Sequence, residues 1–407
     1  MTDTKQQKNA GRAKNTGSSR KGTASGGRSG KSRMSVRRRR VIIQLIAGIG
    51  AVILVIAAIW LFLDRRTFRD YEVESTSSQE DTVSTNYVEI DGKVFRYSAE
   101  SASMVNDKQE ILWTTTYDMQ NPIADICDKT AVVADKGGTS MTVFNTDGVL
   151  GNITTSYNIE KVRVAGQGVV AAILDGGDDT WINFYASDGT LIAENQTRVD
   201  EPGYPMDIAV SPDGLIIMVT YQFVEGSKTN SYVAFYNFGT VGQSQIDNIV
   251  SGYTYEGVVI PQIQYLSSGL AVAFRDDGFT IYEGKQIPKE SKSVQVDKEI
   301  VSTFYDEKHI GLVFKDEGED KTYKLEIYGT NGNKMYERSF NIPYTEIKMT
   351  DGYIVMYNSN QVCVVNDRGK EKFNGTIDEG TIRDFFKIGW NRYMLILDNG
   401  VSVIKLT

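Results

Sequence analysis

The sequence is short of the side chains that most metal sites and disulfide frameworks require. Its 407 residues include one histidine, His309, and two cysteines, Cys127 and Cys363. One histidine cannot form a zinc cluster, and two cysteines far apart in the chain do not make a disulfide framework. Each cysteine is interpreted as a small buried apolar residue, with a disulfide between the two as the alternative. No cofactor and no metal are predicted.

Proline is also rare, with 7 residues against 38 glycines. From about Tyr87 onward, short β-type runs alternate with Asp-Gly, Asn-Gly and Gly-Gly turns, and helical periods are few. Asp-Gly and Asn-Gly are preferred dipeptides of tight β-hairpins. The long C-terminal part is therefore predicted to be all-β.

Acidic side chains are almost absent from the first 40 residues. Residues 1–40 hold 13 Lys and Arg against one acid, whereas residues 41–407 hold 31 against 51. A segment so rich in Gly, Ser, Lys and Arg buries too little apolar surface to fold, so residues 1–40 are predicted to be a disordered basic cytoplasmic tail. A nucleic-acid arm is the less favoured interpretation. The residues expected to meet anionic lipid headgroups are Arg37, Arg38, Arg39 and Arg40.

Charge is absent from residues 41–63, which read VIIQLIAGIGAVILVIAAIWLFL. A helix of this length reaches roughly 35 Å, enough to cross a hydrocarbon core of about 30 Å. The stretch continues directly into Asp64, Arg65 and Arg66 rather than into a cleavage site, which favours an uncleaved anchor. More basic residues precede the stretch than follow it. The predicted protein is therefore a single-pass protein of the cell membrane with its N-terminus in the cytoplasm.

The residues after this span divide into a polar stalk, predicted for 64–85, and an extracytoplasmic β-propeller, predicted for 86–407. Apolar runs recur at spacings of 39 to 52 residues, each followed by a turn and a second run. Four short strands in a repeat of roughly 40–50 residues indicate propeller blades. The runs are TAVVAD at 130–135, VVAAILD at 169–175, LIIMVTY at 215–221, LAVAFRDD at 270–277, IGLVFKD at 310–316, YIVMYN at 353–358 and YMLILDN at 393–399.

An earlier partial repeat within residues 93–116 brings the number of blades to eight. Seven blades is the alternative, if this repeat merges with the last one. The chain ends on the third strand of the last repeat, so its outer strand is expected from Tyr87–Ile90, which would close the ring without a free edge. The second strands are almost continuously apolar, whereas the fourth strands are predicted to be polar, as in 334–340 and 370–376.

Two segments resemble known propellers. MDIAVSPDGLIIMVTY, with Ser211-Pro212-Asp213-Gly214, resembles the inner-strand hairpin of the WD-repeat and TolB-like superfamily. KVFRYSAESASMVNDKQEILW, which ends at Trp113, resembles a quinoprotein-type blade. With its basic tail and apolar span, the chain looks like an uncharacterised family of single-pass, membrane-anchored propellers of Gram-positive bacteria. The resemblance covers about 87–407 and implies a fold but no activity, because propellers host scaffolds, receptors and enzymes.

Sequence marks of propeller enzymes are missing. The chain lacks the adjacent cysteines of quinoprotein dehydrogenases, and the string from Asp175 to Trp181 departs from the spacing of sialidase boxes. The same acidic string meets no calcium-ligand spacing of known type. We therefore predict that the protein is not an enzyme, with a carboxylate-based glycan lyase or hydrolase as the alternative.

Tyrosines recur in the loops that connect one blade to the next, on the face that also carries the acidic second-to-third turns. Asp-Gly hairpin chemistry accounts for the acids, but tight turns do not require tyrosine. Either each ring packs between blades, or the rings form a rosette that binds a protein or a glycan. The candidate binding residues are Tyr117, Tyr157, Tyr204, Tyr253 and Tyr344.

The predicted function is that of a membrane-anchored scaffold in the cell envelope that binds a protein or a glycan. An envelope sensor that signals through the basic tail is the second hypothesis, and a propeller-type glycan lyase or hydrolase is the third. No nucleic-acid partner is predicted.

Overall fold

The computed structural model describes residues 36–78, 84–106, 108–198, 202–316 and 322–407. The chain divides into two compact units, Met1–Arg66 and Thr67–Thr407. Most of the predicted basic tail, residues 1–35, lies outside the described residues, whereas residues 36–40 begin a helix.

Helix α1 (Val36–Arg65) contains the whole of the predicted span 41–63. Within the helical residues that the structure describes, no helix has the length and apolarity needed to cross a membrane. The transmembrane anchor therefore stays a prediction.

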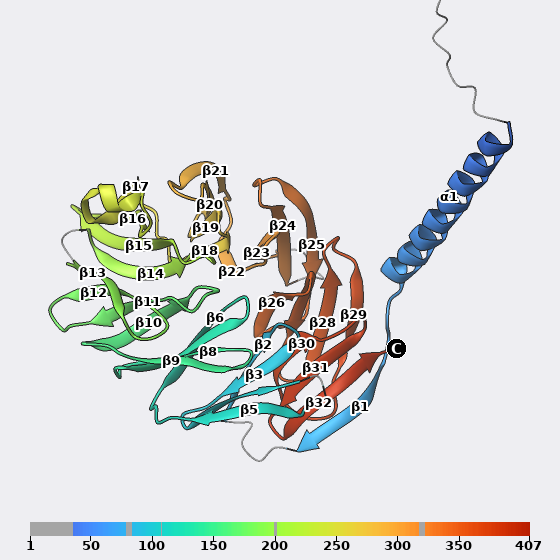
Figure 1. The fold of residues 1–407 in the computed structure, drawn as a ribbon, viewed down its shortest axis with the longest axis horizontal. Coiled ribbons are helices and arrows are strands. Elements are labelled where there is room, and N and C mark those ends of the chain that lie inside the picture. The colour runs from blue at the N-terminus through green and yellow to red at the C-terminus, as the bar shows by residue number, and fades with distance from the viewer. Residues whose placement is uncertain (1–35, 79–83, 107, 199–201, 317–321) are drawn as a thin grey trace, which may run out of the picture. The chain divides into compact units, whose positions relative to one another are not determined.

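The second unit is a β-propeller of eight blades, each an antiparallel sheet of four strands. Figure 1 shows the blades arranged as a ring, with the first strand of each blade toward the centre. The all-β prediction and the count of eight are confirmed. Blades 1 to 4 comprise β2 (Asn86–Ile90), β3 (Lys93–Tyr97), β4 (Ser101–Val105) and β5 (Ile111–Thr116); β6 (Pro122–Cys127), β7 (Thr130–Asp135), β8 (Ser140–Asn145) and β9 (Gly148–Thr154); β10 (Asn158–Val164), β11 (Val170–Asp175), β12 (Thr180–Tyr185) and β13 (Leu191–Thr197); β14 (Tyr204–Val210), β15 (Ile216–Glu225), β16 (Lys228–Asn237) and β17 (Ile249–Tyr255). Blades 5 to 8 comprise β18 (Gln262–Ser267), β19 (Leu270–Arg275), β20 (Gly278–Glu283) and β21 (Lys289–Gln295); β22 (Ile300–Tyr305), β23 (His309–Lys315), β24 (Tyr323–Gly329) and β25 (Lys334–Phe340); β26 (Glu346–Thr350), β27 (Tyr353–Tyr357), β28 (Gln361–Asn366) and β29 (Glu371–Thr376); β30 (Ile382–Lys387), β31 (Arg392–Leu397), β32 (Gly400–Leu406) and β1 (Tyr71–Ser78). Two short 3-10 helices, η1 (Gly242–Ser244) and η2 (Ile246–Asn248), precede β17.

The apolar core lies between blades. A separate buried cluster fills each blade-to-blade contact, for example where Val132 and Val143 of blade 2 meet Val162 and Leu174 of blade 3. A second strand has a neighbouring blade on both of its faces, so consecutive side chains are all buried, as they are throughout β7. This arrangement explains the continuous apolar runs that predicted the repeat.

The ring is closed by β1, which pairs with β32 from Tyr71 opposite Leu406 to Ser78 opposite Gly400. The prediction that Tyr87–Ile90 supplies this strand is wrong, because those residues lie within β2, the inner strand of blade 1. Asp91 and Gly92 adopt positive φ values of 52° and 71° and form a two-residue turn that pairs β2 with β3.

The predicted stalk therefore contains a strand of the propeller. Strand β1 is rich in Ser and Thr. This composition is sufficient because an outer strand is held mainly by backbone hydrogen bonds and needs few buried side chains. Residues 79–83 of the predicted stalk lie outside the described residues.

The outer strands of blades 1 to 7 share an irregularity in their pairing with the third strands. In each of blades 1 to 7, the register between the third and fourth strands shifts by one residue where the fourth strand begins. Such a β-bulge sets two consecutive residues opposite one partner and interrupts the alternation of side chains.

Candidate binding surfaces

Three of the five candidate tyrosines pack inside the propeller. Tyr117 donates a hydrogen bond to the Ser101 carbonyl oxygen at 2.9 Å, and its ring lies 6.4 Å from that of Phe144. The Tyr344 hydroxyl bonds that of Ser302 at 2.7 Å, and the ring contacts Phe340.

Tyr253 lies in the outer strand β17 rather than in a loop, which corrects its predicted position. Its hydroxyl donates to the Pro288 carbonyl oxygen of the next blade at 3.2 Å. These three rings pack between blades, and each contacts a different cluster of the core. Among the ring pairs that the described residues form, none joins two of the five candidates, so a rosette is not observed.

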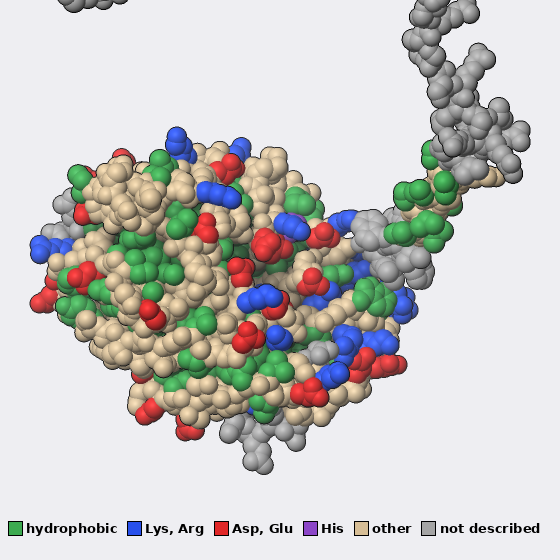
Figure 2. Space-filling view, viewed as in Figure 1, with side chains coloured by type: hydrophobic (Ala, Val, Ile, Leu, Met, Phe, Trp, Pro, Cys, Tyr) green, Lys and Arg blue, Asp and Glu red, His purple; other side chains and the backbone are tan. Residues whose placement is uncertain are grey.

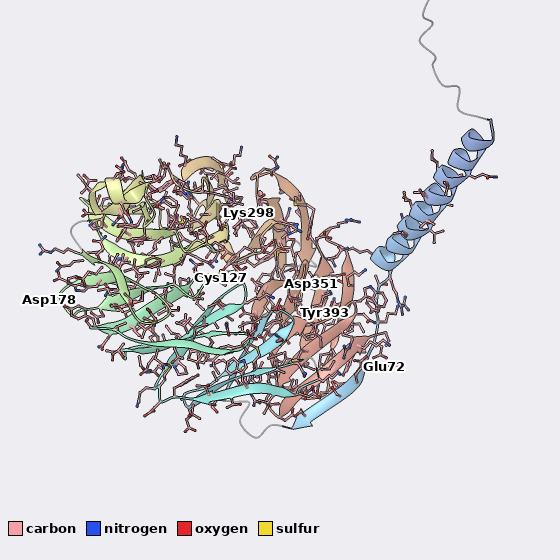
Figure 3. All side chains as sticks on the ribbon, viewed as in Figure 1. Glu72, Cys127, Asp178, Lys298, Asp351 and Tyr393 are labelled. Carbon is pink, nitrogen blue, oxygen red and sulfur yellow. The ribbon has the colours of Figure 1, made fainter. Side chains whose placement is uncertain are left out.

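The other two tyrosines, Tyr157 and Tyr204, are exposed. Tyr157 stacks on Trp181, with the ring centres 5.5 Å apart. Tyr204 lines a cleft of about 700 Å³ beside the β11–β12 turn. Asp178 projects from this turn, as Figure 3 shows, and Asp179 pairs with Arg198 at 3.8 Å. The lining residues are Asp178, Asp179, Arg198, Tyr204, Gln222, Phe223 and Val224.

The chemistry of this cleft combines aromatic rings with carboxylates. The rings of Tyr204 and Phe223 offer apolar area, and Asp178 adds an exposed negative charge. Such a cleft suits a cationic or aromatic side chain of a partner. The structure therefore brings together one predicted tyrosine and the predicted acidic turn of blade 3.

The inner strands of blades 2 to 5 are linked by charged side chains. Asp207 of β14, 2 % exposed, accepts hydrogen bonds from Lys161 Nζ at 2.9 Å and Arg163 Nη2 at 3.2 Å. Its other oxygen accepts from the Ile263 backbone N–H at 2.9 Å. Asp125 of β6 lies on the other side of Arg163, 3.8 Å away. Burial raises the pKa of Asp125 to about 6, against the lowering effect of Arg163. Because each of these charges has a partner, we assign the network to holding the ring together.

Aliphatic side chains are exposed at the bulges of three consecutive blades. The two residues of the bulge are Ile111 and Leu112 in blade 1, and both are solvent-exposed. Blades 2 and 3 repeat the feature, and the exposed fractions of all six side chains lie between 40 % and 57 %. We call this set the aliphatic rim. Its members are Ile111, Leu112, Val149, Leu150, Leu191 and Ile192.

The three pairs belong to adjoining parts of the surface. The indole N–H of Trp113, beside the first pair, donates to the Thr146 carbonyl oxygen in the turn that precedes the second pair. Gly151, beside the second pair, lies against Ser187 in the turn that precedes the third. Figure 2 shows hydrophobic side chains at the surface over the lower and left part of the propeller, where Figure 1 places blades 1 to 4.

The same bulge carries different residues elsewhere in the ring. Blade 4 has Ile249 and Val250, which are half-buried. Blade 5 has Glu290 and Ser291, blade 6 has Lys334 and Met335, and blade 7 has Glu371 and Lys372. The prediction of polar fourth strands therefore holds for blades 5 to 7 and is wrong for the bulges of blades 1 to 4. The aliphatic pairs were visible in the sequence, but only the bulge register shows that both residues of each pair face solvent.

Metal and thiol chemistry have little basis in the described part of the chain. No group of three or more His, Cys, Asp or Glu side chains there is placed to hold a metal ion. In the Asp175 turn, one carboxylate oxygen accepts the Gly177 N–H at 2.8 Å, as in an ordinary Asx turn. Cys127 and Cys363 are free thiols, so the alternative of a disulfide is wrong.

Residues 64–406 match the family described as a family of unknown function, DUF5711, and the chain belongs to this family. No curated protein matches the chain.

Solved structures similar to this chain are propellers. Chaetomium thermophilum Sqt1 bound to the N-terminus of ribosomal protein L10 has 10% sequence identity and a TM-score of 0.52, over 83% of this chain and 100% of that one. A eukaryotic initiation factor has 13% identity and a TM-score of 0.50, over 83% of this chain and 87% of that one. BamB from Moraxella catarrhalis has 11% identity and a TM-score of 0.49, over 83% of this chain and 100% of that one.

At these identities the likeness concerns the fold alone, which is the β-propeller.

Proposed function

We propose that this member of the DUF5711 family is a scaffold that binds a protein through the aliphatic rim of blades 1 to 3. The observation that carries the proposal is the exposure of six aliphatic side chains at equivalent bulges of three adjacent blades. Exposed apolar patches of this kind mark interaction sites, because leaving them in water has a free-energy cost.

The side chains of the rim favour a protein over a glycan. Sugar rings stack on aromatic side chains, whereas the rim is purely aliphatic and matches apolar side chains of a polypeptide. One exposed acid precedes each pair, namely Glu110, Asp147 and Asp188. The partner is therefore expected to present apolar side chains flanked by basic ones.

The test compares capture of envelope proteins by the full chain, purified in mild detergent, and by two variants. The rim variant replaces Leu112, Leu150 and Ile192 with serine. The matched control replaces Tyr204 and Phe223 with serine, in the aromatic cleft of blades 3 and 4. All replaced side chains except Phe223 are largely exposed, so both variants are expected to keep the melting temperature of the parent.

A protein that is captured by the parent and the cleft variant, and lost by the rim variant, supports the proposal. Equal capture by the parent and the rim variant contradicts it. Loss in the cleft variant alone moves the binding surface to Tyr204 and Phe223.

We further propose that residues 41–63 anchor the protein in the cell membrane as a single pass. The support is their uncharged composition and the excess of basic residues before them. The N-terminus would then lie in the cytoplasm, with Arg37–Arg40 at anionic headgroups and the propeller in the envelope. Cysteines introduced at Ser18, in the tail, and at Ser402, in a buried strand, test the orientation. An impermeant maleimide added to intact cells should react with neither, because Ser18 would lie in the cytoplasm and Ser402 is buried. A third cysteine at the exposed Thr407 should react, and reaction at Ser18 without lysis refutes the proposed topology.

A further inference from the structure

In blade 1 a charged side chain lies in the interior of the second strand, where most other blades carry apolar side chains. The interior of the second strand is apolar in blades 2, 3 and 5 to 8, but β3 places Arg96 there. Arg96 stands in the same row of the sheet as Val94, which packs against blade 8. Its cross-strand neighbours are Tyr87 on β2 and Ser103 on β4, and Thr114 lies beyond Ser103 in the same row.

The guanidinium of Arg96 has no carboxylate partner among the described residues. The group is half-buried, and its Nε donates a hydrogen bond to the Ser103 hydroxyl. Comparable guanidiniums in the propeller are paired: Arg275 with Asp277 at 2.7 Å and Arg338 with Glu371 at 2.6 Å. Within the described residues, the terminal nitrogens of Arg96 therefore keep donors that an anionic ligand could accept from.

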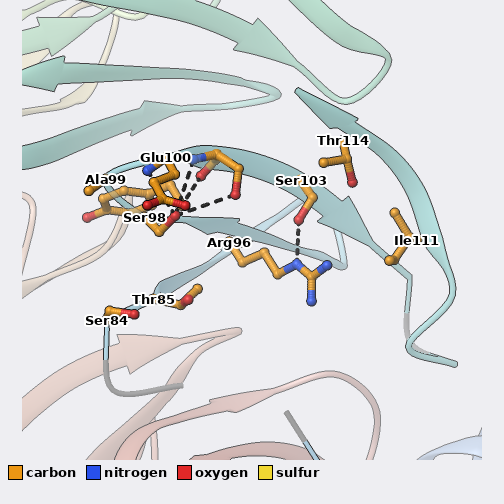
Figure 4. A pocket seen from close by; sticks show the side chains of 11 residues that line it. Ser84, Thr85, Arg96, Ser98, Ala99, Glu100, Ser103, Ile111 and Thr114 are labelled. Carbon is orange, nitrogen blue, oxygen red and sulfur yellow. Dashed lines mark hydrogen bonds between the residues drawn. The ribbon is translucent and has the colours of Figure 1, made fainter. Parts of the chain in front are cut away.

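Arg96 lies in a cleft of about 570 Å³, within the range of small-molecule sites. Figure 4 shows Arg96 bonded to Ser103 through one nitrogen, with no bond drawn to its two terminal nitrogens. Hydroxyl groups dominate the lining, which also includes one carboxylate and two apolar side chains. The lining residues are Ser84, Thr85, Arg96, Tyr97, Ser98, Ala99, Glu100, Ser101, Ser103, Ile111 and Thr114.

We propose that this cleft binds a small hydroxyl-rich molecule through a single carboxylate, as in a sugar acid. A planar guanidinium fork matches the two oxygens of a carboxylate. The hydroxyls of Thr85 and Thr114, which make no hydrogen bond within the described residues, match hydroxyl groups of the ligand. Glu100 lines the same cleft without an ion pair to Arg96, and its negative charge repels a dianion such as phosphate more than a monoanion. The cleft borders the aliphatic rim, because Ile111 belongs to both, and binding of a small molecule there goes beyond the scaffold function.

Calorimetric titration of the full chain in detergent tests the assignment with four probes. Glucuronate is the expected ligand, glucose is its neutral analogue, inorganic phosphate is the dianion, and a capped Gly-Glu-Gly tripeptide offers a carboxylate without hydroxyls. Glucuronate should bind at least about tenfold more tightly than each of the others, because a hydrogen bond to a charged group contributes about 1.5–3 kcal/mol.

Three variants complete the test. Arg96→Gln should weaken glucuronate binding at least about tenfold, and Arg96→Lys should weaken it less, since lysine keeps the charge but loses the fork. Arg383→Gln, which removes an exposed guanidinium in blade 8, should bind as the parent does. Equal melting temperatures of the variants show that lost binding is not lost folding.

Unchanged glucuronate binding by Arg96→Gln overturns the proposal, and so does the absence of glucuronate binding to the parent. Tighter binding of phosphate or of the tripeptide also overturns it, in favour of a dianion or an acidic segment of a protein.

Discussion

Closure of the ring by β1 depends on Phe68, which lies in the segment that the sequence predicts to be a stalk. The Phe68 ring is 8 % exposed and belongs to the cluster between blades 7 and 8. It meets the Trp390 ring edge-on at 6.0 Å, and its backbone N–H donates to the Lys372 carbonyl oxygen at 2.7 Å. If residues 64–85 were a solvated stalk, the substitution Phe68→Ala would have no effect on stability.

The expected cost of Phe68→Ala follows from these contacts. A phenylalanine truncated to alanine in a closed core costs about 3–5 kcal/mol, and Phe68 lies at the edge of its cluster, so we expect about 2–3 kcal/mol. The unfolding entropy is about 2.1 cal/mol/K per residue, or about 0.7 kcal/mol/K for a unit of roughly 340 residues. The melting temperature should therefore fall by about 3–4 °C.

Differential scanning calorimetry of the full chain measures this shift. Val73→Ala is the matched control, because Val73 lies in β1 but its side chain is 42 % exposed, and its melting temperature should change by less than about 1 °C. A chain that begins at residue 86 should also expose the edge of β32 and aggregate. Equal melting temperatures for Phe68→Ala and Val73→Ala would refute closure of the ring by this segment.

Three further predictions concern titratable groups. Burial raises the pKa of Asp125 to about 6, so the folded state holds this proton more tightly than the unfolded state, and the free energy of unfolding should decrease as pH rises from about 4 to about 6. Urea unfolding across this range should show a loss of about 2–3 kcal/mol relative to Asp125→Asn, and parallel curves for the two proteins would contradict the raised pKa. The carboxylate of Asp306, 2.9 Å from His309 Nδ1, raises the pKa of this only histidine, so its stabilising effect is present below about pH 6.5 and is lost as pH rises through the folded pKa. Proton NMR should place the titration midpoint of His309 above pH 6.5 in the parent and at a lower pH in Asp306→Asn. Burial raises the pKa of Cys127 and of Cys363 to about 12, so both thiols should resist iodoacetamide at pH 8 until the chain is unfolded, and rapid labelling of the folded chain would refute their burial.

The fold could be predicted from the sequence because its strongest signal is local and repeated. TAVVAD at 130–135 and its six counterparts are second strands, which are covered on both faces and so read as unbroken apolar runs. The Asp91-Gly92 turn could also have identified β2 and β3 as one hairpin. The sequence instead leads us to expect that Tyr87–Ile90 closes the ring, because the last repeat lacks its outer strand. Strand β1 has too few apolar residues to be recognised as that strand.

The candidate site was harder to predict because it depends on register and on contacts between blades. Tyr117, Tyr253 and Tyr344 have the residue type of a binding surface, but their hydroxyls and rings are used in packing. Tyr204 differs only in lying beside a cleft, and nothing in its local sequence marks that. Arg96 was visible in the sequence, but its lack of an ion pair with any described carboxylate is a property of the folded chain.

A propeller offers each blade the same backbone positions, so function has to reside in the positions where the blades differ. The bulge at the start of the fourth strand is such a position, because it occurs in blades 1 to 7, and in blades 1 to 3 both of its side chains are exposed. Stability alone favours polar residues there, as in Glu290 and Ser291 of blade 5. Blades 1 to 4 carry aliphatic pairs instead, and those of blades 1 to 3 are exposed. Chance placement would scatter such residues around the ring rather than collect them on neighbouring blades. The concentration of apolar surface on one side of a repeating frame therefore indicates a surface that a partner covers.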